Sequence, residues 1–243
     1  MARFYVPKEN VKEELIYIDG NEAKHILNVM RLKEADKVVI FDGTGKEYAG
    51  FIKDIKQRSL VVEIVSTRVP KADKLPTITL VQAIPKRDRM DQIVEKATEL
   101  GVSAIIPLIS ARTITKVRSE KEINKAARWR KIAQAAAKQC GRVGIPEIGR
   151  VRNFEEIMGE VRNYDLACMA CLADDTIHLK DAISNFKAGK AIFLIGPEGD
   201  FTPKEITMAN DASCKLITLG SRVLKSDTAG LYILSVLNYE FSK

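Results

Sequence analysis

The sequence contains no run of about eighteen apolar residues, so we expect no membrane-spanning helix and no association with a membrane. Its first residues, Met1 to Pro7, lack the long apolar stretch of a secretory signal peptide, and we expect the protein in the cytoplasm. Internal repeats and low-complexity tracts are absent as well. With 243 residues, 46% of them hydrophobic, the chain is long enough to bury a core in one large domain or two modest ones.

Ligands for a metal ion are scarce. The four cysteines include the pair Cys168 and Cys171, spaced as C-x-x-C, but no second pair and no nearby pair of histidines accompanies them. A structural zinc site needs four ligands at set spacings. The pair lies within the apolar run 166–172, which favours small buried side chains on a strand. We therefore expect no metal site.

A complete phosphate-binding loop is also missing. Residues 42–46, Asp-Gly-Thr-Gly-Lys, lack the full G-x-x-x-x-G-K-[ST] spacing, and no helical pattern follows them. The Asp-Gly pair instead favours a hairpin turn between strands at 38–41 and 48–55. With a third strand at 60–65 and a short helix at 22–30, residues 1 to about 70 are predicted to form a small β-rich domain. Prolines and polar residues at 66–76 indicate a linker.

From residue 77 onward, predicted strands alternate with predicted helices. The strands are expected at 78–83, 104–109, 164–172, 191–195 and 215–219, and the helices at 89–100, 119–139 and 228–241. Ser119 and Glu122 fit a capping box at the start of the second helix. The alternation predicts an α/β domain over residues 77–243, built on a mainly parallel sheet.

Acidic residues are nearly absent between Arg112 and Arg142. Ten lysines and arginines in this segment are opposed only by Glu120 and Glu122, so the segment carries a net charge of +8 in a chain whose net charge is +7. Such clustered positive charge is typical of a protein that binds a polyanion. A solvated helix face is the alternative, but such faces usually carry residues of both signs. We therefore expect nucleic-acid contact along this segment.

Two glycine-bearing loops follow predicted strands in the second half of the chain. The first loop, residues 196–201, begins Gly-Pro-Glu-Gly and precedes Thr202 to Glu205, which are typical of a helix start. The second loop, residues 219–225, contains Gly220 and leads into the last helix. Glycine lets a ligand approach the backbone closely, and neighbouring parallel strands share a crevice at their carboxyl ends. The sequence therefore predicts one ligand site formed by both loops.

The two loops resemble the cofactor site of the SPOUT class of RNA methyltransferases, and most closely that of the RsmE family. The resemblance continues through 25–31, 41–43, 86–91, 96–101 and 139–142, in the family's order. It implies methylation of N3 of a uridine in small-subunit (16S) ribosomal RNA, with S-adenosyl-L-methionine as cofactor. The substrate is naked RNA or the assembled small subunit. It also implies a PUA-like RNA-binding β-barrel domain over residues 1–70 and a trefoil-knotted SPOUT domain over residues 77–243.

Roles for individual residues follow from the chemistry and from the resemblance. Glu198 is the candidate base for the N3 proton, with capping of the next helix as its alternative, and Arg222 is the candidate cation. Asp227 and Thr228 fit the N-terminal cap of the last helix. The expected cofactor contacts are Leu172, Leu194, Ile195, Gly196, Pro197, Glu198, Gly199, Leu219, Gly220, Val223, Leu224, Thr228 and Ala229. The expected RNA contacts are Arg3, Arg31, Lys86, Arg87, Arg89, Arg128, Arg130, Lys131 and Arg142.

The last predicted helix, 228–241, is apolar nearly all round. A helix without a polar stripe is buried on both sides. This fits a helix held between its own sheet and a partner subunit, so we expect a homodimer, as in the SPOUT class. Burial wholly within one subunit is the alternative.

Three positions depart from the family's pattern. Lys225 stands where arginine is usual, Asp227 where glutamate is usual, and Lys138 where glutamate is common. The first two keep the sign of the charge, whereas the third reverses it and argues against an essential carboxylate there. Two other functions stay open: a SPOUT ribose 2′-O-methyltransferase and a non-catalytic RNA-binding ribosome assembly factor. The matched blocks in the β-rich domain favour the uridine-N3 enzyme over the first, and the intact glycine loops argue against the second.

Overall fold

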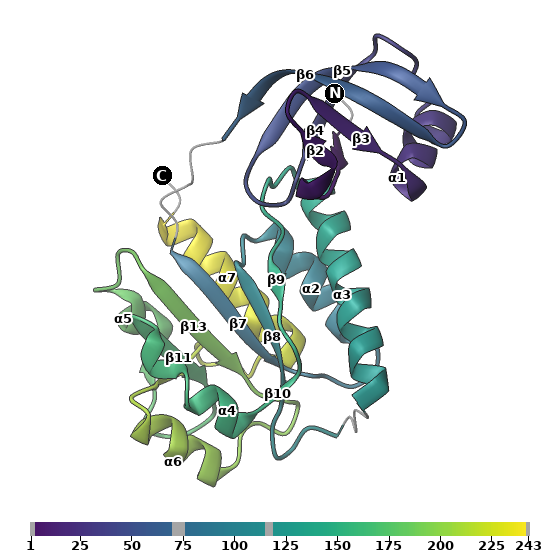
Figure 1. The fold of residues 1–243 in the computed structure, drawn as a ribbon. Helices are drawn as coiled ribbons and strands as arrows, with labels where there is room; N and C mark the ends of the chain where they lie inside the picture. Colours follow the sequence, from purple (N-terminus) through teal and green to yellow (C-terminus); the bar gives the residue numbers. More distant parts are fainter. Residues whose placement is uncertain (1–2, 70–75, 115–118, 242–243) are drawn as a thin grey trace. The chain divides into compact units, whose positions relative to one another are not determined.

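The computed structural model describes residues 3–69, 76–114 and 119–241, apart from the side chains of residues 119–124. The chain divides into two compact units, whose elements are labelled in Figure 1. Unit 1 consists of residues 1–72 and 137–145, and unit 2 of residues 73–136 and 146–243. The domain limits at 70 and 77 stay predictions. These limits assign residues 137–145 to the second domain. In the structure these residues pack in unit 1 instead, and there the Ile145 N–H donates to the Gly43 carbonyl at 3.2 Å.

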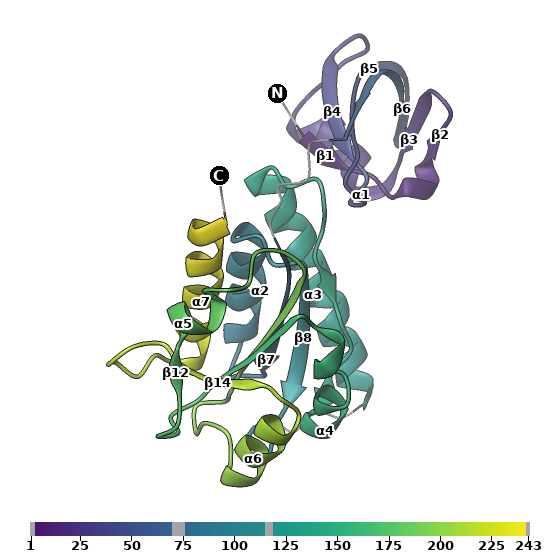
Figure 2. The ribbon, with the colours of Figure 1, turned by 90° about the vertical axis from the view of Figure 1, so that its left-hand side faces the viewer.

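Unit 1 is built on a curled sheet, which Figure 2 shows in side view. Over the described residues the sheet has six strands in the order β1-β4-β5-β6-β3-β2. Its centre is the antiparallel set β4 (Lys37–Phe41), β5 (Glu47–Lys56) and β6 (Ser59–Arg68). This set confirms the predicted hairpin and third strand. Apolar side chains including Phe4, Ile16 and Ile40 fill the inside of the curl.

Sequence reasoning missed the short strands of unit 1. The remaining elements are β1 (Arg3–Tyr5), η1 (Lys8–Asn10), β2 (Val11–Lys12), β3 (Leu15–Ile18), α1 (Gly20–Lys24) and the π turn η2 (His25–Val29). Strands of two to four residues are too short to show an alternating pattern. The predicted helix at 22–30 is present as α1 and η2. The linker prediction was wrong at its start, because Ser66 to Arg68 continue β6, while residues 70–75 lie outside the described residues.

Unit 2 contains a sheet in which every strand pairing among the described residues is parallel. The strand order is β10-β8-β7-β13-β11-β14-β12, with β9 beside β8. The strands are β7 (Thr77–Ala83), β8 (Ala104–Ile109), β9 (Glu147–Ile148), β10 (Arg152–Asn153), β11 (Leu166–Ala170), β12 (Ile177–His178), β13 (Lys190–Ile195) and β14 (Lys215–Thr218). The five longer strands match the predicted ones, which confirms the parallel α/β fold class.

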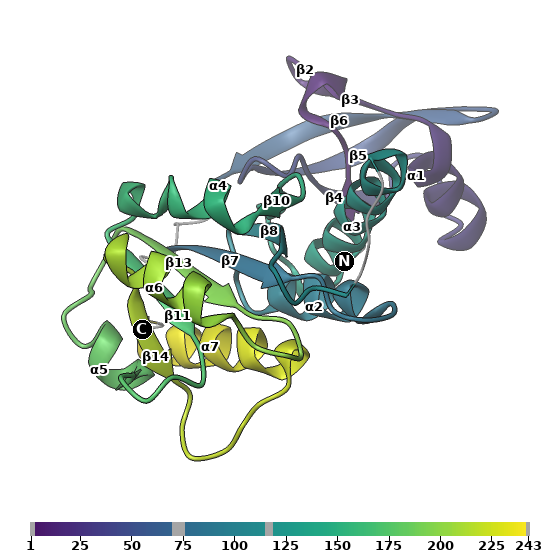
Figure 3. The same cartoon turned by 90° about the horizontal axis from the view of Figure 1, so that it is seen from below.

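Helices cover both faces of this sheet, as the view in Figure 3 shows for unit 2. The helices are α2 (Arg89–Glu99), α3 (Ser119–Cys140), α4 (Phe154–Met158), η3 (Val161–Asn163), α5 (Leu179–Ile183), α6 (Pro203–Asp211) and α7 (Ser226–Phe241). Helices α2, α3 and α7 lie on one face, and α4 and α6 on the other, where Phe154, Leu194 and Phe201 share a core. No helix in the described part of the chain is both long and apolar enough to cross a membrane.

The helix starts differ in how well they were predicted. The predicted start of α6 is confirmed, since the Thr202 hydroxyl accepts from the Glu205 N–H and the Glu205 carboxylate accepts from the Thr202 N–H at 2.8 Å. Helix α7 begins at Ser226, two residues earlier than predicted. Asp227 and Thr228 therefore lie within its first turn, and the prediction that they cap it was wrong. The predicted capping box at Ser119 and Glu122 lies outside the described side chains.

One side of α7 is buried and the opposite side is not. Ile233, Leu234 and Leu237 are completely or almost completely buried, whereas Tyr232 is 42% exposed and Tyr239 84% exposed. Burial of the whole helix within a single subunit is therefore excluded for these described residues. Among the described residues, Tyr232 and Tyr239 thus form an exposed aromatic surface on α7.

Candidate functional site

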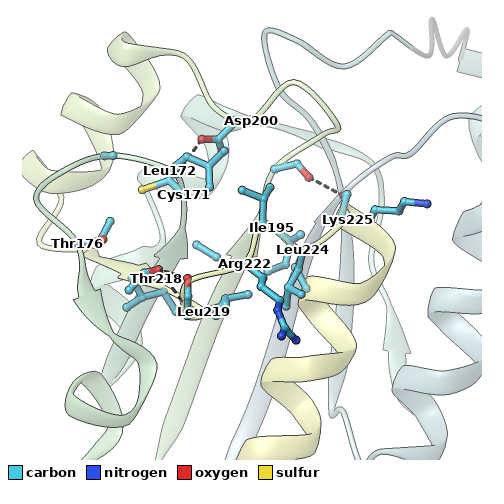
Figure 4. A pocket seen from close by; sticks show the side chains of 18 of the residues that line it. Cys171, Leu172, Thr176, Ile195, Asp200, Thr218, Leu219, Arg222, Leu224 and Lys225 are labelled. Carbon is cyan, nitrogen blue, oxygen red and sulfur yellow. Dashed lines mark hydrogen bonds between the residues drawn. The ribbon is translucent and has the colours of Figure 1, made fainter.

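The carboxyl ends of β11, β13 and β14 surround one cavity of about 440 Å³. Three segments line it: residues 170–173 and 176 from the end of β11, residues 195–198 and 200 from the end of β13 into the first loop, and residues 217–226 from the end of β14 through the second loop, together with Ala229. Figure 4 shows side chains from these segments around the cavity, with Asp200 and Leu172 on one side and Arg222 and Lys225 on another. The three strands are neighbours in a parallel sheet, so the loops that follow them meet at one edge. Both glycine loops thus contribute to a single crevice.

Most residues that the sequence indicated for this site line the cavity. They are Leu172, Ile195, Gly196, Pro197, Glu198, Leu219, Gly220, Arg222, Val223, Leu224 and Ala229. Three predicted cofactor contacts do not. The Leu194 side chain is completely buried in the core under α4 and α6, Gly199 faces the Arg112 side chain, and Thr228 is exposed on the first turn of α7. Sequence alone placed these three near the loops but could not tell which side of the backbone faces the cavity.

Several lining residues were not indicated by the sequence. They are Ala170, Cys171, Ala173, Thr176, Asp200, Ile217, Thr218, Ser221, Lys225 and Ser226. The segment after β11 carries no glycine motif, so only its position beside β13 and β14 brings it to the site. Its polarity at Asp174 and Asp175, directly after an apolar strand, is the one sequence signal that marks a loop there.

The glycines of the two loops are needed for different reasons. A Cβ atom at Gly196 would lie 3.2 Å from two ring carbons of Phe201 and 3.3 Å from the Asp200 Oδ1. Gly196 therefore allows the buried Phe201 ring to pack against the loop. At Gly220 a Cβ would meet no described atom within 4 Å, but the φ angle of +119° belongs to a region that favours glycine strongly. The backbone conformation at this position therefore requires glycine.

A buried hydrogen-bond chain joins three segments below the cavity. The Ser226 hydroxyl donates to the Gly196 carbonyl at 2.6 Å and accepts from Gln82 Nε2 at 2.9 Å. Gln82 belongs to β7, Gly196 begins the first loop, and Ser226 begins α7. All three residues are buried. The chain therefore fixes the end of the second loop against the start of the first.

Glu198 is placed by a contact with the segment that precedes α2. Its Oε1 accepts the backbone N–H of Lys86 at 3.1 Å, and the residue is exposed at the cavity wall. The alternative role of Glu198 as a helix cap is wrong, because Thr202 and Glu205 cap α6. Arg222 is exposed on the opposite, second loop. The two candidate catalytic side chains thus come from different walls of one cavity.

Cys168 in β11 and Cys171, which follows this strand, carry uncharged thiols near this site. Burial raises the pKa of the Cys168 thiol to about 12. Burial also raises the pKa of Cys171, a hydrogen bond from the Ala173 backbone opposes this, and the negative charge of Asp200 adds to the rise. A thiol with a raised pKa is a poor nucleophile and a poor metal ligand. Cys171 therefore contributes an apolar wall, as the apolar run 166–172 indicated.

The predicted RNA contacts in unit 2 fall into two groups. Lys86, Arg87 and Arg89 follow β7, beside the first loop, where the Arg89 guanidinium lies 3.3 Å from the Asp227 carboxylate. The second group lies on α3. The Arg128 guanidinium donates to the Asp91 carboxylate, and Arg130 donates weakly to the Ile148 carbonyl at 3.4 Å. Lys131 is exposed beside a shallow hollow lined by Ala127, Ile132 and Ala135.

The predicted RNA contacts in unit 1 are less uniform. The Arg3 guanidinium lies over the Phe41 ring, 4.4 Å from its centroid, and 3.4 Å from the Glu47 carboxylate. Its three nitrogens are buried, and burial lowers the pKa of Arg3. Arg142 is partly buried, which lowers its pKa too, and Arg31 is exposed with a left-handed φ of 54°. Arg3 is thus built into unit 1, whereas Arg31 is accessible to a ligand.

Comparison with known proteins gives two matching domain models. An RNA methyltransferase PUA domain matches residues 18–65, and an RNA methyltransferase domain matches residues 73–238. Two curated relatives are the ribosomal RNA small subunit methyltransferases E of Bacillus subtilis, 27% identical over 99% of this chain and 97% of that protein, and of Mycobacterium bovis, 28% identical over 96% and 90%.

A solved structure is similar as well. The ribosomal RNA small subunit methyltransferase E from Neisseria gonorrhoeae, solved bound to S-adenosyl methionine, matches with a TM-score of 0.88 and 29% identity over 99% of this chain and 98% of that one. The similarity therefore includes both units and both glycine loops. Since the RNA methyltransferase model matches more than half of the chain, residues 73–238, this protein belongs to the RNA methyltransferase family, with an RNA methyltransferase PUA domain before it.

Proposed function

We propose that this protein transfers a methyl group from S-adenosyl-L-methionine to N3 of a uridine in small-subunit (16S) ribosomal RNA. The observation that carries the proposal is the single cavity lined by both glycine loops at the carboxyl edge of the parallel sheet. The relatives support it, because they are named for methylation of small-subunit ribosomal RNA and one was solved with S-adenosyl methionine.

The residues around the cavity fit this cofactor. A volume of about 440 Å³ lies within the range of about 300–1,000 Å³ typical of small-molecule sites. Ile195, Leu219 and Leu224 offer apolar walls for a flat base, and the backbone around Gly220 is open to close approach. Two acidic and two basic side chains add charges of both signs to the lining, which suits a ligand with charged groups. When bound, the cofactor supplies an electrophilic methyl group on a positively charged sulfur.

The protein side chains have to make N3 of uridine nucleophilic. N3 carries a proton, and its removal leaves negative charge on the ring. Glu198 is the proposed acceptor of that proton, since the Lys86 N–H holds its carboxylate at the cavity wall. Arg222, on the second loop, is the proposed cation that stabilises the charge left on the ring. The two roles require side chains from both loops, which the cavity provides.

RNA docking is proposed to use the exposed basic residues. Lys86 and Arg87 lie next to the first loop, Lys131 lies on α3, and Arg31 lies on unit 1. Their charges suit phosphate groups around the target nucleotide. Naked RNA and the assembled small subunit both offer such phosphates. Ribosomal RNA as substrate also supports a cytoplasmic location.

The homodimer belongs to the proposal too. The exposed side of α7 carries Tyr232 and Tyr239, and aromatic side chains are enriched at protein interfaces. We propose that this side meets a second copy of the chain. Sedimentation at micromolar concentration should give a dimer mass, and Tyr239→Glu should shift it toward a monomer. A monomeric parent protein would contradict this part of the proposal.

The trefoil knot is likewise a proposal. Residues 219–225 leave β14 and reach Ser226, which contacts Gly196 after β13 and Gln82 on β7. In the strand order β7-β13-β11-β14, this segment has to pass the ends of β11 and β13. Such a return path across other connections supports the knot that the family resemblance implies.

The deciding experiment is a methylation assay with labelled methyl donor. Purified protein is incubated with small subunits and with naked 16S RNA, and the RNA is digested to nucleosides for mass spectrometry. The proposal expects 3-methyluridine. A ribose-methylated nucleoside would indicate the 2′-O-methyltransferase instead, and RNA binding without methylation would indicate an assembly factor. Glu198→Gln keeps the acceptor for Lys86 and should slow turnover by about 100-fold at saturating cofactor.

A further inference from the structure

One residue in the cavity wall has a backbone conformation that suits glycine better than its own type. Asp200, at the end of the first loop, has a φ of 58°, and its N–H closes a turn by donating to the Pro197 carbonyl at 3.0 Å. Non-glycine residues are uncommon in this left-handed region, although Asp and Asn tolerate it best. Because glycine would fit this backbone conformation better, the presence of aspartate indicates that its side chain has a function.

The Asp200 carboxylate is held across two walls of the cavity. Its Oδ2 accepts the backbone N–H of Leu172 at 2.9 Å, as the dashed line in Figure 4 shows. Leu172 follows β11, whereas Asp200 follows β13. On its other side, Oδ1 lies 3.3 Å from the position that a Cβ atom would take at Gly196. The carboxylate is therefore a fixed negative charge and not a freely rotating one.

The charges around the cavity are separated by sign. Glu198 and Asp200 come from the first loop, and Arg222 and Lys225 come from the second. Glu198 is exposed, whereas Asp200 is half-buried, so solvent screens the charge of Asp200 less. Asp200 also acts on the cavity lining, since its charge adds to the raised pKa of Cys171. Asp200 is thus the less screened of the two carboxylates that line the cavity.

We propose that Asp200 is a specificity-determining residue that makes the cavity prefer the positively charged sulfonium cofactor over the neutral thioether product. The inference rests on the proposed function and deepens it. In methyl transfer the sulfur–methyl bond breaks, its electron pair stays on sulfur, and the methyl group bonds to the substrate nitrogen. The sulfur thereby loses its positive charge. A fixed carboxylate attracts the sulfonium but not the thioether, so it favours entry of the cofactor and departure of the product.

The test compares the binding of the two ligands to Asp200→Asn by calorimetric titration. Asparagine keeps an oxygen that accepts the Leu172 N–H and tolerates the left-handed backbone, so only the charge is removed. We expect the affinity for S-adenosyl-L-methionine to fall by about fivefold to tenfold, which is the effect of roughly 1 kcal/mol of charge interaction in a partly solvated site. The affinity for S-adenosyl-L-homocysteine should stay within about twofold.

Two controls separate this effect from others. Asp211→Asn removes the same charge from an exposed position at the end of α6, outside the cavity lining, and should leave both affinities unchanged. Raising the salt concentration should reduce the parent protein's preference for the sulfonium and have less effect on Asp200→Asn. If Asp200→Asn does not fold, Asp200→Gly removes the charge at a position where glycine relieves the backbone.

The outcomes distinguish this inference from the proposed function. If the parent protein binds neither ligand, the proposed function fails and the inference fails with it. If the parent binds both and Asp200→Asn weakens both equally, Asp200 only joins the two loops and the inference is overturned. Unchanged affinities for both ligands in Asp200→Asn would overturn the inference as well. The same holds for Asp200→Gly if that variant has to be used in place of Asp200→Asn. A selective loss for the sulfonium supports it.

Discussion

The Ser226 hydroxyl donates a hydrogen bond of 2.6 Å to the Gly196 carbonyl, which lies 30 residues earlier in the chain. The same oxygen accepts from the Gln82 amide, so its one donor and one of its acceptor positions are both used. These groups are buried, and buried polar groups have to find partners within the protein. The shape of the cavity therefore depends on the first residue of α7 as much as on the two loops.

Ser226→Ala should destabilise the protein and weaken cofactor binding. The substitution leaves the Gly196 carbonyl and the Gln82 amide with fewer partners in a buried place, which costs about 1–3 kcal/mol. Urea unfolding measures the loss, and calorimetric titration measures the affinity. Ser235→Ala is the matched control, because this exposed hydroxyl on the same helix bonds, among the described residues, only to the Leu231 carbonyl. Equal effects of the two substitutions would contradict the role given to Ser226.

The sequence pattern predicted the elements whose formation depends on neighbouring residues. The strands at 78–83, 104–109 and 191–195 and the start of α6 depend on nearby residues and were predicted within a residue or two. The hydrogen bond between Gln82 and Ser226 joins residues 144 apart, and no spacing rule could reveal it.

For the same reason the sequence did not indicate Asp200 as a site residue or the ion pair of Arg128 with Asp91. Asp200 became a site residue only when β11 and β13 proved to be neighbours, and Arg128 and Asp91 are 37 residues apart. Contacts of this kind follow from the strand order, which helical and strand periodicities do not specify. Sequence therefore located the site by its two glycine loops but not the polar contacts that shape it.

Gly220→Ala should distort the second loop although there is room for the added methyl group. No described atom lies within 4 Å of a Cβ at this position, but the φ of +119° costs an alanine about 1–3 kcal/mol. We expect lower thermal stability and weaker cofactor binding. Gly144→Ala tests the interpretation, since that glycine also has open space around its Cβ but no positive φ. If Gly144→Ala and Gly220→Ala behaved alike, backbone strain would not be the cause.

Unit 1 should lose stability in alkaline solution. Tyr48 donates to the Asp42 carboxylate at 2.9 Å, and burial, this hydrogen bond and the Asp42 charge raise the pKa of Tyr48 to about 12. In the unfolded chain a tyrosine ionises near pH ~10. The folded state holds the proton more tightly, so the stabilisation is complete below pH ~10 and is lost as the pH rises to about 12.

Tyr48→Phe isolates this contribution. The variant should be less stable than the parent below pH ~10, because Asp42 loses a donor, and the difference should shrink between pH ~10 and about 12. Urea midpoints across this range measure it. Tyr17→Phe changes an exposed tyrosine of the same unit and should leave the stability below pH ~10 unchanged. Parallel profiles for Tyr48→Phe and the parent would refute the assignment.

The last prediction separates two basic residues on the same face of α3. Lys131 is exposed, so Lys131→Ala should weaken RNA binding and reduce the slope of log affinity against log salt by roughly 0.7, without loss of stability. Arg128 also donates to Asp91, which accepts from the Trp129 indole at 3.1 Å as well. Arg128→Ala should therefore cost up to about 1 kcal/mol of stability besides any change in slope, since the Arg128 side chain is 58% exposed and solvent weakens its ion pair. Cofactor affinity should stay constant in both variants, because neither residue lines the cavity. An unchanged slope in stably folded Lys131→Ala would remove this part of α3 from the RNA surface and leave the exposed Arg31 of unit 1 as the next position to test.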